Sequence, residues 1–280
     1  MQVLTRMTHP GQARTPVPMR LDADSLAAAA AEAGLDAASI VVRPLAAAAA
    51  AVELDSIRPL YPASMIKVPL VAAALFEIAR GRYAGGDPVH VDEANMTAND
   101  AESPLVPGYR SSPDELMHLA ISRSDNVATN LLFDLVGRER ATGIARERFG
   151  LPGTVFARKL SGSDPLIVDP QWDGSTRNAH PAADAARLFA AIARDEVPLA
   201  HRLLDMLAAQ AWNEKLNPGL LPGDRFLHKT GDTSEVTHDG GILIDARGER
   251  WVVVAYTGLA STDEHNARFA PFMRRIRPLL

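Results

Sequence analysis

The sequence predicts an α/β protein of the α+β kind, in which an antiparallel sheet flanked by helices carries an all-helical lobe. Two observations support this prediction. Short apolar runs between turn residues, typical of strands, occur near residue 40 and again in the last third of the chain. The middle of the chain instead has apolar residues at helical spacing. Because strand-forming segments stand at both ends, we expect one sheet built from both ends with the helical lobe inserted between them.

This pattern divides the chain of 280 residues into three parts. We expect a polar, flexible tail over 1–20, a sheet domain formed by 21–60 and 190–280, and an all-helical lobe over 61–189. The sheet domain and the lobe would form one continuous catalytic unit. With 47% hydrophobic residues, a chain of this length can bury a substantial core.

A helix and a strand follow the tail. Either Asp24 or Ser25 can cap a helix that runs through the alanines to Gly34, a residue type that commonly ends helices. Residues 39–43 are then typical of a strand. The alanine run over 46–51 is ambiguous, because its composition favours a helix and its position favours the next strand of a hairpin. We predict a strand there.

Helices are predicted through the middle of the chain. From Ser64 to Gly81 the apolar residues recur at helical spacing. Pro69 is compatible with this helix because N–H groups in the first turn have no partner within the helix. A second helix opens at Pro113, and a third covers about 127–135.

The last part of the chain begins with a long loop and returns to strands. Residues 150–178 are rich in Gly, Pro, Asp and Ser, and loops of this length are often functional. A helix resumes at Pro181. Antiparallel strands and a closing amphipathic helix are then predicted over 226–231, 241–244, 251–256 and, for the helix, 262–277.

Composition narrows the function classes. The formal net charge is −5 and no basic cluster is visible, which argues against nucleic-acid binding. The eight histidines are scattered, so we expect no metal site and no cofactor. The absence of cysteine excludes disulfides and thiol chemistry.

No membrane contact is expected either. No apolar run approaches the roughly 18–20 residues that span a bilayer, and the first 20 residues lack the apolar region of a secretory signal. This predicts a cytoplasmic protein as the chain is given, or a periplasmic or secreted one if the N-terminus is truncated or misassigned.

Three short motifs stand in one order along the chain and together supply the groups of an acyl-transferring serine enzyme. At average residue usage, this combination is roughly a one-in-a-thousand accident. The motifs are Ser64-Met65-Ile66-Lys67, Ser124-Asp125-Asn126 and Lys229-Thr230-Gly231.

The first motif provides a nucleophile and a base. Ser64 and Lys67 are three residues apart, so on one helix their side chains share a face. A serine hydroxyl is a poor nucleophile at pH 7 and needs a base within hydrogen-bond reach. Lysine can serve if burial and a neighbouring cation lower its pKa, and Lys229 would be that neighbour.

The other two motifs complete the site. Ser124 can pass a proton to the leaving group and the Asn126 amide can bind a substrate amide, although the second motif alone would also pass as a helix N-cap. We expect Asp125 to fix the turn by bonding to the backbone. In the third motif, Lys229 and Thr230 can hold a substrate carboxylate.

Gly231, the last residue of the third motif, is also expected to contribute to substrate binding. Without a side chain it would let the substrate backbone approach closely.

The motifs and their spacing resemble those of class A serine β-lactamases and related penicillin-binding proteins. The likeness covers roughly residues 20–280. It implies a sheet domain and an all-α lobe with the active site between them, Ser64 as the acylated nucleophile and Lys67 as its base partner. The backbone N–H groups of Ser64 and Asp232 would form the oxyanion hole, where the charged Asp232 is an unusual residue. The implied partner is a small-molecule substrate, either a β-lactam or a peptide-like amide or ester.

The chain departs from that family in the long loop. Class A enzymes carry a glutamate there that activates the water for hydrolysis of the acyl-enzyme, and the corresponding position here falls near Leu160. Asp164, Asp169 and Asp173 are nearby, and each is a candidate acid for deacylation or an ordinary turn-former.

This departure leaves three functions open. With a resident base the protein is a β-lactamase. Without one it resembles a penicillin-binding protein, a D-alanyl-D-alanine peptidase or an esterase with slow deacylation. The third possibility is a β-lactam sensor that is acylated once and stays acylated.

Overall fold

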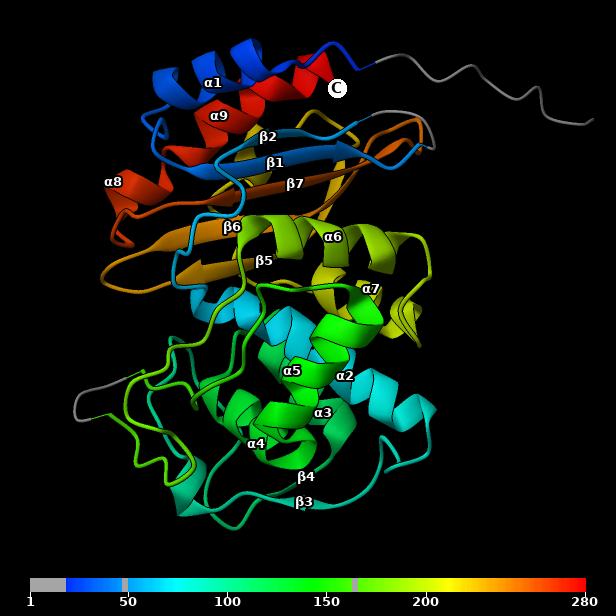
Figure 1. Cartoon of the computed structure of the whole chain (residues 1–280), viewed down its shortest axis with the longest axis vertical. Coiled ribbons are helices and arrows are strands. Elements are labelled where there is room, and N and C mark those ends of the chain that lie inside the picture. Colours follow the sequence, from blue (N-terminus) through cyan, green and yellow to red (C-terminus); the bar gives the residue numbers. More distant parts are fainter. Residues whose placement is uncertain (1–18, 47–49, 163–165) are drawn as a thin grey trace, which may run out of the picture.

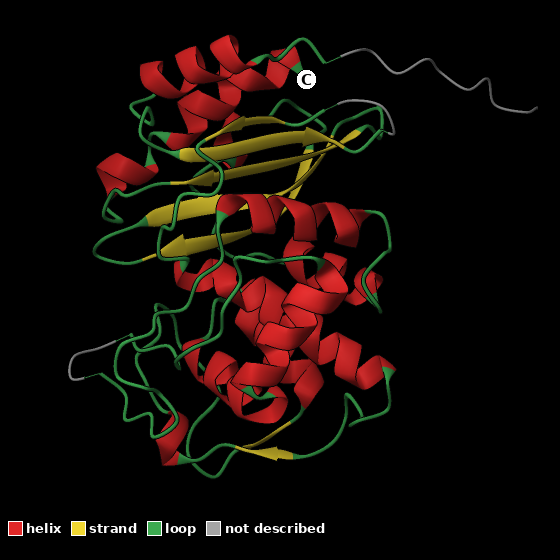
Figure 2. Ribbon diagram, in the orientation of Figure 1, coloured by secondary structure: helices red, strands yellow, loops and turns green. Residues whose placement is uncertain are grey.

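The computed structural model describes residues 19–46, 50–162 and 166–280. A five-stranded antiparallel sheet lies at one end of the molecule and a group of helices at the other (Figures 1 and 2). The strand order is β2-β1-β7-β6-β5, so the two N-terminal strands pair with the three C-terminal ones, as the sequence predicts. The strands are β1 (Ser39–Pro44), β2 (Val52–Leu54), β5 (Arg225–Asp232), β6 (Thr237–Ile244) and β7 (Arg250–Tyr256).

The middle of the chain is mainly helical, as the sequence predicts. Short 3-10 helices are η1 (Ala63–Ile66), η2 (Glu93–Asn95), η3 (Asn217–Gly219) and η4 (Arg277–Leu279). Strands β3 (Val89–His90) and β4 (Arg110–Ser111) pair in a small antiparallel sheet. The α-helices are α1 (Ala23–Glu32), α2 (Lys67–Ala79), α3 (Pro113–Ser122), α4 (Asn126–Val136), α5 (Arg138–Phe149), α6 (Ala182–Ala193), α7 (Ala200–Ala208), α8 (Asp263–Asn266) and α9 (Phe269–Ile276).

Alternation along the strands builds a core on each face of the sheet. In β1, Ile40 and Val42 pack with α1 and α9, whereas Val41 points to the opposite face. Helix α6 covers that opposite face (Figure 1). The apolar core beneath it continues without a break into the helical lobe around α2. The central strand β7 is buried on both faces, which explains its continuous run Trp-Val-Val-Val-Ala-Tyr.

Among the predicted boundaries that differ from the structure, three concern the helix after the tail, the alanine run and the closing helix. Helix α1 is capped by Asp22, whose carboxylate accepts a hydrogen bond from the Ser25 N–H at 2.8 Å, rather than by Asp24 or Ser25. Part of the alanine run (47–49) lies outside the described residues, and β2 begins only at Val52.

The closing helix is the third of these boundaries, because it is divided into α8 and α9. Pro271 has no N–H to donate to the carbonyl of Ala267, which interrupts the helical hydrogen bonds at that point.

The predicted boundary between the helical lobe and the sheet domain lies inside a helix of the structure. The expected boundary between 189 and 190 falls within α6, which packs along β1, β6 and β7. Helices α5 and α7 were not anticipated from the sequence. Helix α5 follows α4 directly at Gly137, which adopts a φ of 83°.

Candidate active site

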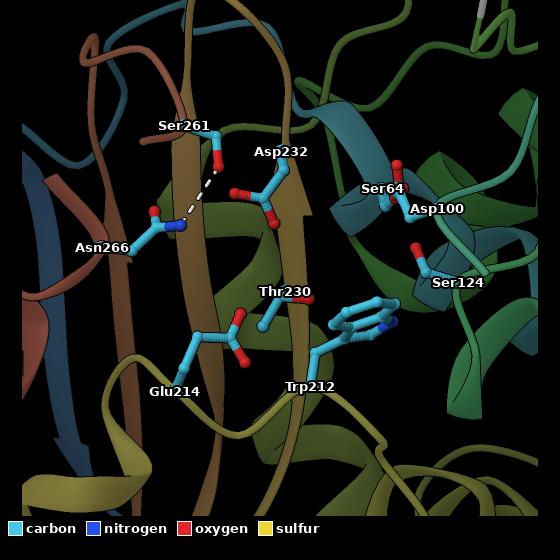
Figure 3. Close-up of a pocket in the computed structure, with 9 residues that line it drawn as sticks. All are labelled: Ser64, Asp100, Ser124, Trp212, Glu214, Thr230, Asp232, Ser261 and Asn266. Atoms are coloured by element: carbon cyan, nitrogen blue, oxygen red, sulfur yellow. Dashed lines mark hydrogen bonds between the residues drawn. The ribbon is translucent and has the colours of Figure 1, made fainter. Parts of the chain in front are cut away.

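The three motifs meet where the helical lobe joins the sheet. Ser64 lies in η1 at the start of α2, Ser124 in the turn between α3 and α4, and Lys229 on the edge strand β5. Two adjoining pockets open at this junction, and Ser64 lines both. The strand-side pocket is lined by Ser64, Asp100, Ser124, Trp212, Glu214, Thr230, Asp232, Ser261 and Asn266 (Figure 3). The loop-side pocket is lined by Tyr61, Ala63, Ser64, Asp100, Asn126, Leu160, Ser161, Gly162, Asp232, Thr233 and Ser234.

Lys67 is completely buried beneath the pockets. Its ammonium donates to the Ser124 hydroxyl at 3.1 Å, to the Asn126 side-chain oxygen at 2.9 Å and to the Ser124 carbonyl oxygen. Burial, together with the charge of Lys229, holds the pKa of Lys67 well below its usual range. A lysine in this environment is suited to accept a proton near neutral pH.

The Ser124 hydroxyl connects the two buried lysines. It accepts hydrogen bonds from Lys67 at 3.1 Å and from Lys229 at 2.9 Å. Burial lowers the pKa of Lys229 to about 7. Ser124 adopts a left-handed φ of 60°, unusual for serine, and the turn is held because the Asp125 carboxylate accepts a bond from the Ala128 N–H at 2.8 Å. Asp125 therefore fixes the turn through the backbone, as the sequence predicts.

Ser64 occupies a strained turn. Ala63 before it has a φ of 46°, and backbone strain of this kind is concentrated at functional sites. Ser64 is partly exposed and faces both pockets, one turn before Lys67.

Gly231 brings β5 close to this turn. A Cβ at Gly231 would lie 3.1 Å from both the Pro62 carbonyl oxygen and the Met65 Cγ, and 3.3 Å from Ala63. Its expected role in admitting the substrate backbone stays a prediction, and within the protein the neighbour that it accommodates is the turn at η1. The missing side chain thus allows Ser64 and Asp232 to border the same pockets.

The wall on β5 carries an acidic residue that a buried lysine holds in place. Both oxygens of Asp232 accept bonds from the fully buried Lys215, at 2.6 and 2.8 Å, and Thr237 donates to one of them at 3.0 Å. Lys215 also donates to the carbonyl oxygen of His238 at 3.0 Å. Thr230 lies two residues before Asp232, on the same face of β5, and is almost completely buried.

The long loop is fixed by buried polar contacts. At Leu160, the backbone N–H and carbonyl bond to the Asn130 side chain at 2.8 and 2.9 Å. Asp169 forms an ion pair with Arg138 and accepts a bond from the Lys159 N–H at 2.8 Å.

Of the three aspartates considered for deacylation, the two that the structure describes do not line the pockets. Asp169 is occupied by its ion pair and lines neither pocket. Asp173 is exposed and stabilises its own turn through the N–H groups of Ser175 and Thr176. Asp164 lies outside the described residues.

The sequence analysis missed several pocket residues, among them two acids and a tryptophan. Asp100, Trp212 and Glu214 line the strand-side pocket and come from loops without a recognisable motif (Figure 3). Two other observations concern the described part of the chain alone. It holds no group of three or more His, Cys, Asp or Glu residues placed to bind a metal ion, and none of its helices is long and apolar enough to cross a membrane.

The fold, which brings the three motifs together, is that of a serine hydrolase. The chain matches the family described as "Beta-lactamase enzyme family" over residues 23–276, and it belongs to that family. This confirms the resemblance drawn from the motifs. A search of curated proteins finds no match.

Solved structures show the same fold at low sequence identity. A β-lactamase from Sphaerobacter thermophilus DSM 20745 has 23% identity and a TM-score of 0.78, with 92% of this chain and 97% of that chain covered. An ancestral class A β-lactamase has 21% identity and a TM-score of 0.77, with 91% and 100% covered. A leucine-to-glutamate variant of PBP-A, in its acyl-enzyme complex with penicillin G, has 22% identity and a TM-score of 0.78, with 94% and 98% covered.

Proposed function

We propose that this protein is a class A-like serine hydrolase that opens β-lactam or related amide or ester bonds by forming an acyl-enzyme on Ser64. The observation that carries the proposal is the Ser124 hydroxyl, which accepts hydrogen bonds from Lys67 and from Lys229 next to the nucleophile. One hydroxyl between two lysines of lowered pKa is suited to moving protons between nucleophile and leaving group.

The acylation step assigns a role to each group. Lys67, whose pKa is lowered, accepts the proton of the Ser64 hydroxyl while the Ser64 oxygen bonds to the carbonyl carbon of the substrate. The negative charge that develops on the carbonyl oxygen is stabilised by the backbone N–H groups of Ser64 and Asp232. Ser124 then relays the proton to the leaving group, and the bond from the carbonyl carbon to that group breaks.

Substrate contacts follow from the free donors around the nucleophile. Asn126 uses its side-chain oxygen to bind Lys67 and one amide hydrogen to bind the Ala98 carbonyl oxygen at 2.9 Å. Its second amide hydrogen remains for the acyl side chain of a substrate in the loop-side pocket. Lys229 and Thr230 are assigned to a carboxylate on the substrate.

A second function, in which acylation is followed by slow deacylation, is favoured by the long loop. Leu160 stands along the loop-side pocket at the position where the sequence comparison expects a glutamate. The neighbouring carboxylate of Asp169 is held by Arg138. A penicillin-binding or D-alanyl-D-alanine peptidase activity would fit a site with this loop.

Benzylpenicillin distinguishes these functions. The protein is mixed with the drug, and intact mass and free product are followed together over time. Many turnovers indicate a β-lactamase, whereas a lasting stoichiometric adduct with little product indicates a penicillin-binding protein or a sensor.

Two variants and a peptide map locate the reaction. In either case the adduct is expected on the peptide that contains Ser64. It should disappear in Ser64→Ala and persist in Ser175→Ala, a change of an exposed serine outside both pockets. The proposed acyl-enzyme is refuted if the protein forms no adduct and releases no product with either benzylpenicillin or a simple phenyl ester.

A further inference from the structure

Asp100 is a carboxylate that both pockets share with Ser64. Asp232 is the other acidic residue common to the two pockets, but its oxygens are already bound by Lys215 and Thr237. The Asp100 side chain is exposed and, among the described residues, takes part in no hydrogen bond or salt bridge. Its oxygens are therefore available to water that enters the pockets beside the nucleophile.

The chain before Asp100 is anchored on two sides. The side-chain oxygen of Asn99 accepts a bond from the Asn126 N–H at 2.6 Å, and the Ala98 carbonyl oxygen accepts one from the Asn126 amide at 2.9 Å. On the other side, the Gly162 N–H donates to the Thr97 hydroxyl at 2.9 Å.

Packing tightens the same junction. A Cβ at Gly162 would lie 2.2 Å from the Ala98 carbonyl oxygen, so the long loop and this segment are in direct contact. The backbone that carries Asp100 is thus held between α4 and the long loop, beside Ser64. A carboxylate attached to an anchored backbone keeps its place relative to the reacting atoms better than one on a free loop.

The electrostatic effect of Asp100 on the two buried lysines is consistent with its position beside Ser64. The negative charge of Asp100 acts to raise the pKa of both Lys67 and Lys229, against the larger effect of burial. Both buried ammonium groups are therefore within Coulombic reach of Asp100, which is consistent with its place beside the nucleophile.

We propose that Asp100 is the general base of deacylation, an inference that rests on the proposed acyl-enzyme on Ser64. The Asp100 carboxylate accepts a proton from a water molecule as the water oxygen bonds to the acyl carbonyl carbon. The tetrahedral adduct then collapses, the bond between that carbon and the Ser64 oxygen breaks, and the proton passes to the Ser64 oxygen. The product leaves as a carboxylic acid, and Asp100 is again ionised.

The chemistry gives a reason for a base at this place. An acyl-enzyme ester is hydrolysed slowly by neutral water, and a positioned general base contributes typically 10²–10⁴-fold. Leu160 takes the expected place of an acid in the loop, and Asp169 is bound to Arg138. Glu214 lines the strand-side pocket alone, so Asp100 is the carboxylate that lines both pockets with Ser64 and whose oxygens carry no hydrogen bond within the described residues.

The test separates acylation from deacylation. A p-nitrophenyl ester reports acylation of Ser64 as a burst of nitrophenol and deacylation as the steady rate that follows. In Asp100→Asn we expect a burst rate within about twofold of the parent and a steady rate at least about tenfold lower, with the acyl-enzyme accumulating by intact mass. Asp100→Glu should recover part of the steady rate.

Glu102→Gln is the matched control, because it removes the same charge from the same exposed segment at a residue that lines neither pocket. It should keep the parent's burst and steady rates. A loss of the steady rate that is confined to Asp100→Asn, with the burst retained and with partial recovery in Asp100→Glu, is a pattern that a purely structural role would not produce.

Three results would overturn the role of Asp100. They are a steady rate in Asp100→Asn equal to the parent's, a change confined to KM, and a parent enzyme that never releases its acyl group. If the parent gives no burst and no adduct on Ser64, the proposed function itself fails, so the two failures are distinguishable.

Discussion

The pair formed by Lys215 and Asp232 allows a quantitative prediction, because one partner has no access to water. Lys215 is fully buried, and two of its three hydrogen bonds go to the oxygens of Asp232. Asp232→Asn leaves the ammonium with one amide oxygen and the His238 carbonyl as acceptors. Removing one partner of a buried ion pair costs about 3–5 kcal/mol.

The exposure of Asp232 reduces that figure. Its side chain is 31% exposed, so water can replace part of the lost interaction. We therefore expect Asp232→Asn to lower the free energy of unfolding by about 2–3 kcal/mol, which corresponds to a fall in Tm of roughly 4–12 °C at about 2–4 °C per kcal/mol. Urea unfolding followed by circular dichroism measures the free energy, and an unchanged denaturant slope would show that the compactness of the unfolded state is unchanged.

A double variant tests the reasoning itself. If the cost arises from an uncompensated buried charge, Lys215→Met in the Asp232→Asn background should recover at least half of the lost stability. Glu264→Gln, which breaks an exposed pair with Arg268, should cost less than about 1 kcal/mol. The argument is refuted if Asp232→Asn costs less than about 0.5 kcal/mol, or if the double variant is no more stable than the single one.

Three further predictions concern the pocket. Because the pKa of Lys229 is about 7 and its charge is lost as the pH rises through that value, kcat/KM for a substrate with a carboxylate should fall above about pH 7, whereas a neutral ester should lack this limb. A pH–rate profile with the same limb for both substrates would contradict the assigned contact. Leu160→Glu places a carboxylate along the loop-side pocket and should raise the turnover of benzylpenicillin by at least about tenfold, with Leu160→Gln as the uncharged control. Equal turnover rates in Leu160→Glu and Leu160→Gln would show that the carboxylate charge is not the cause of the increase. Gly231→Ala forces β5 away from η1 and should slow acylation, measured by quenched-flow mass spectrometry, by about tenfold or more. Gly143→Ala, a helical change with open space around the new methyl group, should leave acylation unaltered, and an equal loss in both variants would argue against the close approach at Gly231.

The sequence by itself determined the elements whose signals are local. The apolar runs in 226–231 and 251–256 and the helical spacing after Ser64 are patterns among residues a few positions apart, and the structure confirms the strands and the helix there. The division of the closing helix into α8 and α9 was missed by the prediction of one helix over 262–277, although Pro271, which removes a helical hydrogen bond, is a local signal. The three motifs identified the family for the same reason, since each is contiguous in the chain.

Only the tertiary structure decided which groups meet at the pockets. Lys229 reaches the hydroxyl of Ser124 across a separation of 105 residues, and Asp169 is bound to Arg138 across 31. Asp100 lies beside Ser64 although its own neighbours in sequence carry no motif. Side-chain periodicity reports which face of an element is buried, but not which distant element covers it. The positions of these carboxylates therefore follow from packing and from buried ion pairs, which no local pattern records.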